Sequence, residues 1–171
     1  MSTQPLPQIV CDTGPLISLE KLTGGYRFIG RLYDRLLIPP AVMKELVAGQ
    51  FETTDAYLRH FEAEDLVVVE PVSNAGTVEK KTTSLDQGER QAIQLAFERG
   101  LPLLIEEEAG RAVARELGIP ISGIAGQLLK SVREDVILAD EAKSKLTELW
   151  RAGRINRHIF EAVSAAIENE V

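Results

Sequence analysis

The fold is decided by a short apolar stretch near the N-terminus that runs directly into a carboxylate, IVCDTGP at residues 9–15. A second stretch of the same kind, LLIEEE, occupies residues 103–108. Apolar runs without polar alternation are typical of strands covered on both faces, as in a parallel sheet packed between helices. Ligands bind such sheets beyond the carboxyl ends of the strands. We therefore expect the two strands to be neighbours and their terminal acids to share one cleft.

Carboxylates gathered in such a cleft repel one another by about 4 kcal/mol per pair at 4 Å, for an effective dielectric constant near 20. They must therefore retain protons or bind a cation. The first stretch contributes Asp12, and the second contributes Glu106, Glu107 and Glu108. Side chains alternate between the two faces of a strand, so the three glutamates cannot all point into one site.

The remaining chain alternates strands with helices and contains no repeat or linker, which predicts a single doubly wound α/β domain. Residues 74–83 are polar and are expected to form a loop, and a Ser-x-x-Gln capping box at 84–87 should begin the next helix. Three helices, separated near residues 135 and 153, should follow residue 124. The other expected strands are 8–12, 36–38, 66–69, 103–105 and 119–121, and the other expected helices are 16–22, 41–47, 54–63, 84–99 and one ending at 117.

Composition limits the class of protein. At 171 residues, with 44% hydrophobic and 26% charged residues, the chain resembles an ordinary soluble globular domain. No apolar run approaches the ~18 residues of a membrane span, and residues 1–8 show no leader or signal core. The single cysteine, Cys11, favours a reducing cytoplasm. A net charge of −7 argues against a general polyanion binder, but not against a nuclease with an acidic site and a local arginine patch.

Glu89 is the strongest single candidate for a functional residue. It falls in the middle of an apolar helical stripe, where an unpaired carboxylate needs a partner, a proton or a metal. The alternative is a carboxylate near a helix start, eased by the helix dipole and reaching around to water. The stripe consists of Leu85, Ala92, Ile93 and Ala96.

Other candidates are less specific. The tripeptide Asp-Thr-Gly at residues 12–14 is also a common N-cap and turn arrangement. It matches the aspartic-protease signature, but those enzymes are all-β, whereas this chain alternates strands with helices. Glu45 lies away from the apolar face of its helix and, on spacing alone, is a solvated residue. His60 and His158 have no metal-ligand spacing, and the glycines form no phosphate-binding fingerprint.

Four blocks in order resemble the PIN-domain family, in particular the branch of VapC-like toxin ribonucleases. The resemblance implies a three-layer α/β/α domain with a central parallel sheet, a core at about residues 8–130 and a helical C-terminal extension at about 131–171. The blocks are VCDTGPLI at 10–17, IPPAVMKEL at 38–46, LDQGERQAI at 85–93, and LLIEE at 103–107 continuing to LGIPISG at 117–123.

The resemblance also implies a site and a chemistry. One or two Mg²⁺ or Mn²⁺ ions would activate a water for attack on an RNA phosphodiester, and such ions prefer oxygen ligands. The chain departs from the family by carrying glutamates in the fourth block, each longer than aspartate by about 1.5 Å. Mg²⁺ tolerates little displacement of its ligands. The implied catalytic residues are Asp12, Glu45, Glu89 and Glu107, and the implied metal ligands are Asp12, Glu89, Glu107 and Glu106.

Substrate contacts are implied for the Thr13 hydroxyl and for Arg111 and Arg115, which lie one helical turn apart and could hold a phosphate backbone. The expected partners are RNA, a small antitoxin protein and a second copy of the chain, with no membrane. A first alternative is a PIN-like module that binds nucleic acid or protein but has weakened catalysis. A second is a phosphoacceptor receiver domain using Asp12, in which a buried Glu89 has no role. Five apolar residues of the last helices could support either a partner contact or the core of the domain, and we expect them in the core. They are Trp150, Ile155, Ile159, Phe160 and Val163.

Overall fold

The computed structural model describes residue 4 and residues 6–73 and 76–171. Its centre is a five-stranded parallel sheet in the order β3-β2-β1-β4-β5. Val10 pairs with Leu103 and Cys11 with Leu104, so the two acid-terminated strands are neighbours, as predicted. The strands are β1 (Gln8–Cys11), β2 (Arg35–Ile38), β3 (Val67–Val69), β4 (Leu103–Leu104) and β5 (Ile121–Ser122).

The order of the strands determines where a ligand can bind. From β1 the chain moves outward to β2 and β3, and then returns to β4 on the other side of β1. The connections leaving β1 and β4 therefore diverge at the carboxyl ends of these two strands, which is the switch point of a doubly wound sheet. Asp12 follows β1 and Glu106 follows β4 at this point.

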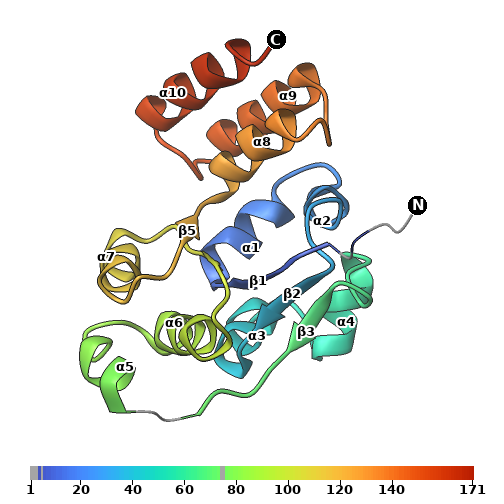
Figure 1. Cartoon of the computed structure of the whole chain (residues 1–171). Coiled ribbons are helices and arrows are strands. Elements are labelled where there is room, and N and C mark those ends of the chain that lie inside the picture. Colours follow the sequence, from blue (N-terminus) through green and yellow to red (C-terminus); the bar gives the residue numbers. More distant parts are fainter. Residues whose placement is uncertain (1–3, 5, 74–75) are drawn as a thin grey trace.

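Helices flank the sheet on both sides, which gives the expected three-layer α/β/α arrangement (Figure 1). α6 packs on β1 and β4 and also contacts α3. The last three helices pack against one another and form a group at the end of the molecule that carries the C-terminus (Figure 1). The helices are α1 (Thr13–Glu20), α2 (Gly25–Ile29), α3 (Pro40–Val47), α4 (Thr54–His60), α5 (Gly76–Lys81), α6 (Gln87–Arg99), α7 (Glu108–Glu116), α8 (Ile124–Arg133), α9 (Ala139–Arg151) and α10 (Arg157–Glu168).

Several local predictions were wrong. The loop expected at 74–83 contains the short helix α5, apart from residues 74–75, which lie outside the described residues. The Ser84–Gln87 capping box is replaced by one formed by Asp86 and Glu89, which starts α6 later. Both segments are polar, and a polar pattern does not distinguish a short solvated helix from a loop, nor one capping oxygen from a neighbouring one. α2 and the start of α1 at Thr13 were also not predicted.

The C-terminal segment forms the three predicted helices, separated where the sequence indicated. Of the five apolar residues expected in the core, Ile155, Phe160 and Val163 are partly buried against it, whereas Trp150 is 39% exposed and Ile159 is 38% exposed. The Trp150 ring stacks on Phe160 with centroids 4.4 Å apart. Cys11 is buried, and burial raises the pKa of its thiol, which agrees with a core residue rather than a nucleophile. No helix in the described part of the chain combines the length and apolarity needed to cross a bilayer.

Candidate active site

Asp12 lies at the carboxyl end of β1 and is only 3% exposed. Its backbone N–H donates to the carbonyl of Leu104 at 3.0 Å, which ties it to the neighbouring strand β4. Asp12 occupies the N-cap position of α1, but its side chain makes no capping hydrogen bond. The capping role therefore does not account for this carboxylate.

Burial raises the pKa of Asp12 to about 7, against an ordinary value of 3.8. A hydrogen bond from the Thr13 backbone acts in the opposite direction, and the nearby charges of Glu89, Asp86 and Glu45 raise the pKa further. Asp12 is thus a buried acid near other acids, but these come from α3 and the start of α6, and not from the end of β4 as the strand-end pattern had predicted. Near neutral pH its carboxyl group is divided between the protonated and ionised forms.

Glu45 reaches the same place from α3. It is exposed, as its spacing predicted, yet its Oε2 accepts a hydrogen bond from the Thr13 hydroxyl. Its carboxylate lies against Gly88, where a Cβ atom would come within 2.9 Å of the Glu45 Cδ. Glycine at position 88 therefore leaves room for the Glu45 carboxylate beside the first turn of α6.

Gly88→Ala is expected to disturb Glu45 without unfolding the protein. The added methyl group meets the movable end of a side chain, and alanine favours a helix over glycine by about 1 kcal/mol. We expect an almost unchanged melting temperature together with Mn²⁺ affinity lowered to the level of Glu45→Gln. Calorimetric titration and thermal unfolding of both variants would check this, and full Mn²⁺ affinity in Gly88→Ala would contradict it.

Glu89 is 7% exposed on α6, as its position in the apolar stripe predicted. Its carboxylate also completes the capping box: the Glu89 N–H donates to Asp86 Oδ1 at 2.8 Å, and the Asp86 N–H donates to Glu89 Oε2 at 3.3 Å. Burial raises the pKa of Glu89, and the charges of Asp86, Glu107 and Glu45 add to this. Only Oε2 is engaged in capping, so Oε1 is available to the site.

Glu106 and Glu107 diverge, as the alternation of side chains predicted. Glu106 is half-buried and accepts hydrogen bonds from the Ser18 hydroxyl at 2.7 Å and the Ile124 N–H at 3.3 Å. It also forms an ion pair with Arg154 at 3.4 Å. Glu107 is exposed at the N-cap of α7 without a capping bond, and is near enough to raise the pKa of Glu89. The free glutamate of this block is therefore Glu107.

Arg111 and Arg115 lie on α7 beside these glutamates. Arg111 Nη1 donates to the carbonyl of Ile105 at 2.8 Å, while Arg115 pairs with Glu108 at 2.9 Å on the surface. Both arginines line a cavity of about 450 Å³ that Arg154 and Glu106 also border. The cavity adjoins the carboxyl end of β4.

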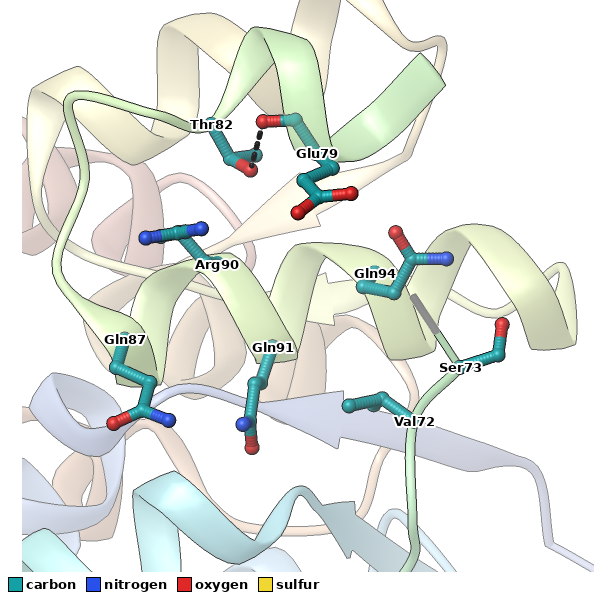
Figure 2. A pocket seen from close by; sticks show the side chains of 8 residues that line it. All are labelled: Val72, Ser73, Glu79, Thr82, Gln87, Arg90, Gln91 and Gln94. Atoms are coloured by element: carbon teal, nitrogen blue, oxygen red, sulfur yellow. Dashed lines mark hydrogen bonds between the residues drawn. The ribbon is translucent and has the colours of Figure 1, made fainter. Parts of the chain in front are cut away.

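A second cavity, of about 280 Å³, lies along another face of α6, between this helix, α5 and the segment after β3 (Figure 2). In Figure 2 the Gln87 and Gln91 side chains extend to one side of α6 and Arg90 extends toward Thr82. Gln91 Oε1 accepts a hydrogen bond from the Ala41 N–H at 3.0 Å. This bond joins α6 to the first turn of α3, and so holds the helices of Glu89 and Glu45 side by side.

A comparison with protein families matches residues 8–169 to the family described as the PIN domain. The chain belongs to the PIN-domain family. PIN domains are generally nucleases, and the family match extends through the C-terminal helices. The structure is also similar to a solved PilT N-terminus domain protein from the hyperthermophilic archaeon Sulfolobus solfataricus P2, with 21% identity, a TM-score of 0.49, and coverage of 73% of this chain and 93% of that one. A search of the curated proteins found no match.

PIN domains are typically dependent on divalent metal ions, and the acids of this PIN domain suit such an ion in kind. All the candidate ligands are carboxylates, the donors preferred by Mg²⁺ and Mn²⁺, and Asp12 is buried among like charges that a cation would neutralise. Among residues 4, 6–73 and 76–171, however, no three Asp, Glu, His or Cys side chains are close enough together to enclose a metal ion as they stand. Binding would require side-chain rotation, for which the exposed Glu107 is available, whereas the exposed Glu45 is held by the Thr13 hydroxyl.

Three further residues of this PIN domain were not singled out from the sequence. Asp86 lies within the third block, and its position three residues before Glu89 was a signal for a capping box. Ser18 and Arg154 bind Glu106 but carry no local signal, since Arg154 is 48 residues from Glu106 in the sequence.

Proposed function

We propose that this PIN domain is a metal-dependent endoribonuclease that hydrolyses RNA phosphodiester bonds. The observation that carries the proposal is Asp12 at the switch point of the sheet, where burial, aided by the charges of Glu89, Asp86 and Glu45, raises its pKa to about 7. Carboxylates that repel one another destabilise the folded protein, so their presence indicates a function. Carboxylates with raised pKa values at a strand end are typical of catalytic sites.

In the proposed mechanism Asp12, Glu89 and Glu107 hold Mg²⁺ or Mn²⁺, and Glu45 completes the acidic site. A cation held there would supply positive charge to lower the pKa of a water and to stabilise the leaving oxygen. Thr13 orients Glu45 through its hydroxyl, and Asp86 holds Glu89 through the capping box. Asp12 would hold a cation in its ionised form, so it would have to give up the proton that burial otherwise retains.

Calorimetric titration with Mn²⁺ and Mg²⁺ tests the proposal first. We expect micromolar binding of Mn²⁺ by the wild type and at least about a tenfold loss in Glu89→Gln, because the amide removes the charge that a cation requires. Glutamine also completes a capping box, so the fold should be retained. Glu116→Gln, which removes only a surface ion pair with Lys81, is the matched control. Equal Mn²⁺ affinity in the wild type and Glu89→Gln would contradict the assigned site.

A second candidate function is a binding module with weakened catalysis. It is favoured by the state of Glu106, whose carboxylate is engaged by Ser18, Ile124 and Arg154. This arrangement occupies one of the fourth-block glutamates that replace the usual aspartates. The binding-module function predicts no metal binding by the wild type and no effect of Asp12→Asn in any activity assay.

The finer part of the proposal is that the protein is a VapC-like toxin, silenced by a small antitoxin and forming a homodimer. It rests on the four sequence blocks, and the partly exposed Trp150 and Ile159 are available for a protein contact. A small gene directly beside this one, whose product co-purifies with the chain and suppresses RNA cleavage, would support this role. Cleavage that no such product affects would contradict it.

A further inference from the structure

The cavity beside Glu106 is lined by three arginines, by the two glutamates Glu106 and Glu108, and by an apolar wall. Three arginines border it, namely Arg111 and Arg115 from α7 and Arg154 from the segment between α9 and α10. This clustering stands out in a chain of net charge −7. The apolar wall consists of Ile121, Ile155, Ile159 and Val163.

Arg154 is directed inward by the way α9 ends. Gly153 has a φ of +71°, the left-handed conformation that glycine adopts readily. The Gly153 N–H donates to the Trp150 carbonyl at 3.0 Å and the Arg154 N–H to the Leu149 carbonyl at 2.9 Å, which is the Schellman pattern of a helix C-terminus. The turn reverses the chain and places the Arg154 side chain against α1 and the end of β4.

Arg154 makes three contacts there. Its Nε donates to the Ser18 hydroxyl at 3.0 Å, and its Nη2 donates to the Gly14 carbonyl at 3.0 Å and lies 3.4 Å from Glu106 Oε1. The longest of the three is the ion pair, so the guanidinium is held mainly by neutral oxygens. An anion in the cavity would therefore compete with Glu106 alone for Arg154.

The other two arginines differ in their availability. Arg115 is paired with Glu108 on the surface. Arg111 donates to the Ile105 carbonyl and, within the described part of the chain, forms no ion pair. A guanidinium carries five N–H donors, so Arg111 retains donors for a ligand in the cavity it borders.

We infer that this cavity binds a nucleotide of single-stranded RNA next to the carboxylates, with its phosphate on Arg111 and Arg154 and its base against the apolar wall. The inference rests on the proposed ribonuclease function and adds to it a binding site built partly from the C-terminal helices. A phosphate offers two oxygens that can accept the paired N–H donors of the planar guanidinium, and a nucleobase has an apolar face. On binding, the phosphate replaces Glu106 as the anionic partner of Arg154.

The test is RNA binding in the absence of metal. A short fluorescein-labelled single-stranded RNA of mixed sequence is titrated with the full chain in EDTA, at several salt concentrations, and binding is followed by fluorescence anisotropy. We expect Arg154→Gln and Arg111→Gln each to weaken binding about tenfold. Each should also reduce the salt-dependence slope by about 0.7, the value for one phosphate contact on a single strand.

Glu106→Gln provides the decisive comparison, because it removes the competing charge and is expected to strengthen RNA binding at least about twofold. A merely structural ion pair would give the same sign of change for Glu106→Gln as for Arg154→Gln. Arg133→Gln, which breaks a surface ion pair with Glu170 among the same C-terminal helices, should leave RNA affinity unchanged. Thermal unfolding checks each variant, and Arg154→Lys, which keeps the positive charge, should retain the salt slope if Arg154→Gln fails to fold.

The outcomes separate this inference from the proposed function. RNA binding that depends on Arg154, without cleavage when Mn²⁺ is added, would support RNA binding in the cavity and contradict the proposed ribonuclease function. Cleavage by the wild type, together with unchanged RNA affinity in the Arg154 and Arg111 variants, would contradict only the inference that the cavity binds RNA. Failure of the wild type to bind RNA would also overturn it and would leave an acidic peptide as the ligand to test.

Discussion

Asp12→Asn is expected to remove a large pH dependence from the stability of this protein. In the folded chain the pKa of Asp12 is about 7, against 3.8 when it is unperturbed. Between these two values the folded state holds a proton that the unfolded state has released, so the free energy of unfolding falls as the pH rises. At about 1.4 kcal/mol per pKa unit the loss reaches up to about 4 kcal/mol, and it is complete above about pH 7.

The measurement is urea unfolding of the wild type and Asp12→Asn in EDTA, from below pH 4 to above pH 7. Asparagine does not titrate, so the variant should be more stable than the wild type above neutral pH and about equally stable in acid. For a chain of this length the full difference corresponds to a rise of about 8–16 °C in melting temperature. Glu89, whose pKa is also raised, is present in both proteins, and because its charge acts on Asp12 the difference includes the coupling between these two groups. Parallel stability curves for the two proteins would contradict the assigned environment of Asp12.

The same substitution is expected to abolish RNA cleavage. A divalent cation contributes several kcal/mol to stabilising the charge that develops during phosphodiester hydrolysis, and each 1.4 kcal/mol corresponds to a factor of ten in rate. Losing the buried carboxylate proposed to hold this cation should therefore lower the rate at least about a hundredfold. The assay is cleavage of labelled RNA in Mn²⁺ at fixed protein concentration.

Asp140→Asn is the matched control for this cleavage assay, since it makes the same chemical change at an exposed position on α9. It should cleave RNA as the wild type does. If Asp12→Asn also retained full activity, the cleavage would have to arise elsewhere in the protein or in a contaminant. Greater stability combined with lost activity in Asp12→Asn is the pattern expected of a residue kept for function at the expense of the fold.

Much of the fold followed from local patterns in the sequence. The apolar runs before Asp12 and Glu106 predicted buried parallel strands, and these strands are hydrogen-bonded neighbours in the sheet. The helical stripe around Glu89 predicted a buried carboxylate, and Glu89 is buried. Such predictions succeed because helical periodicity and strand burial depend on the types of a few consecutive residues, which can be read from the sequence.

Other parts of the site were decided only by tertiary structure. The helical spacing of Glu45 predicted only a solvated residue. In the structure α3 approaches α6 at Gly88, and the Glu45 carboxylate accepts a hydrogen bond from Thr13. The ion pair between Arg154 and Glu106 depends on the turn after α9 and on the packing of the C-terminal helices against α1.

The sequence by itself thus determined the parallel α/β sheet, the acids at its switch point and the buried position of Glu89. Tertiary structure alone decided which of the adjacent glutamates is engaged by an arginine and which stays free. The physical reason is that neighbouring residues of one type have nearly equal local preferences. Contacts between segments far apart in the chain are needed to distinguish Glu106 from Glu107.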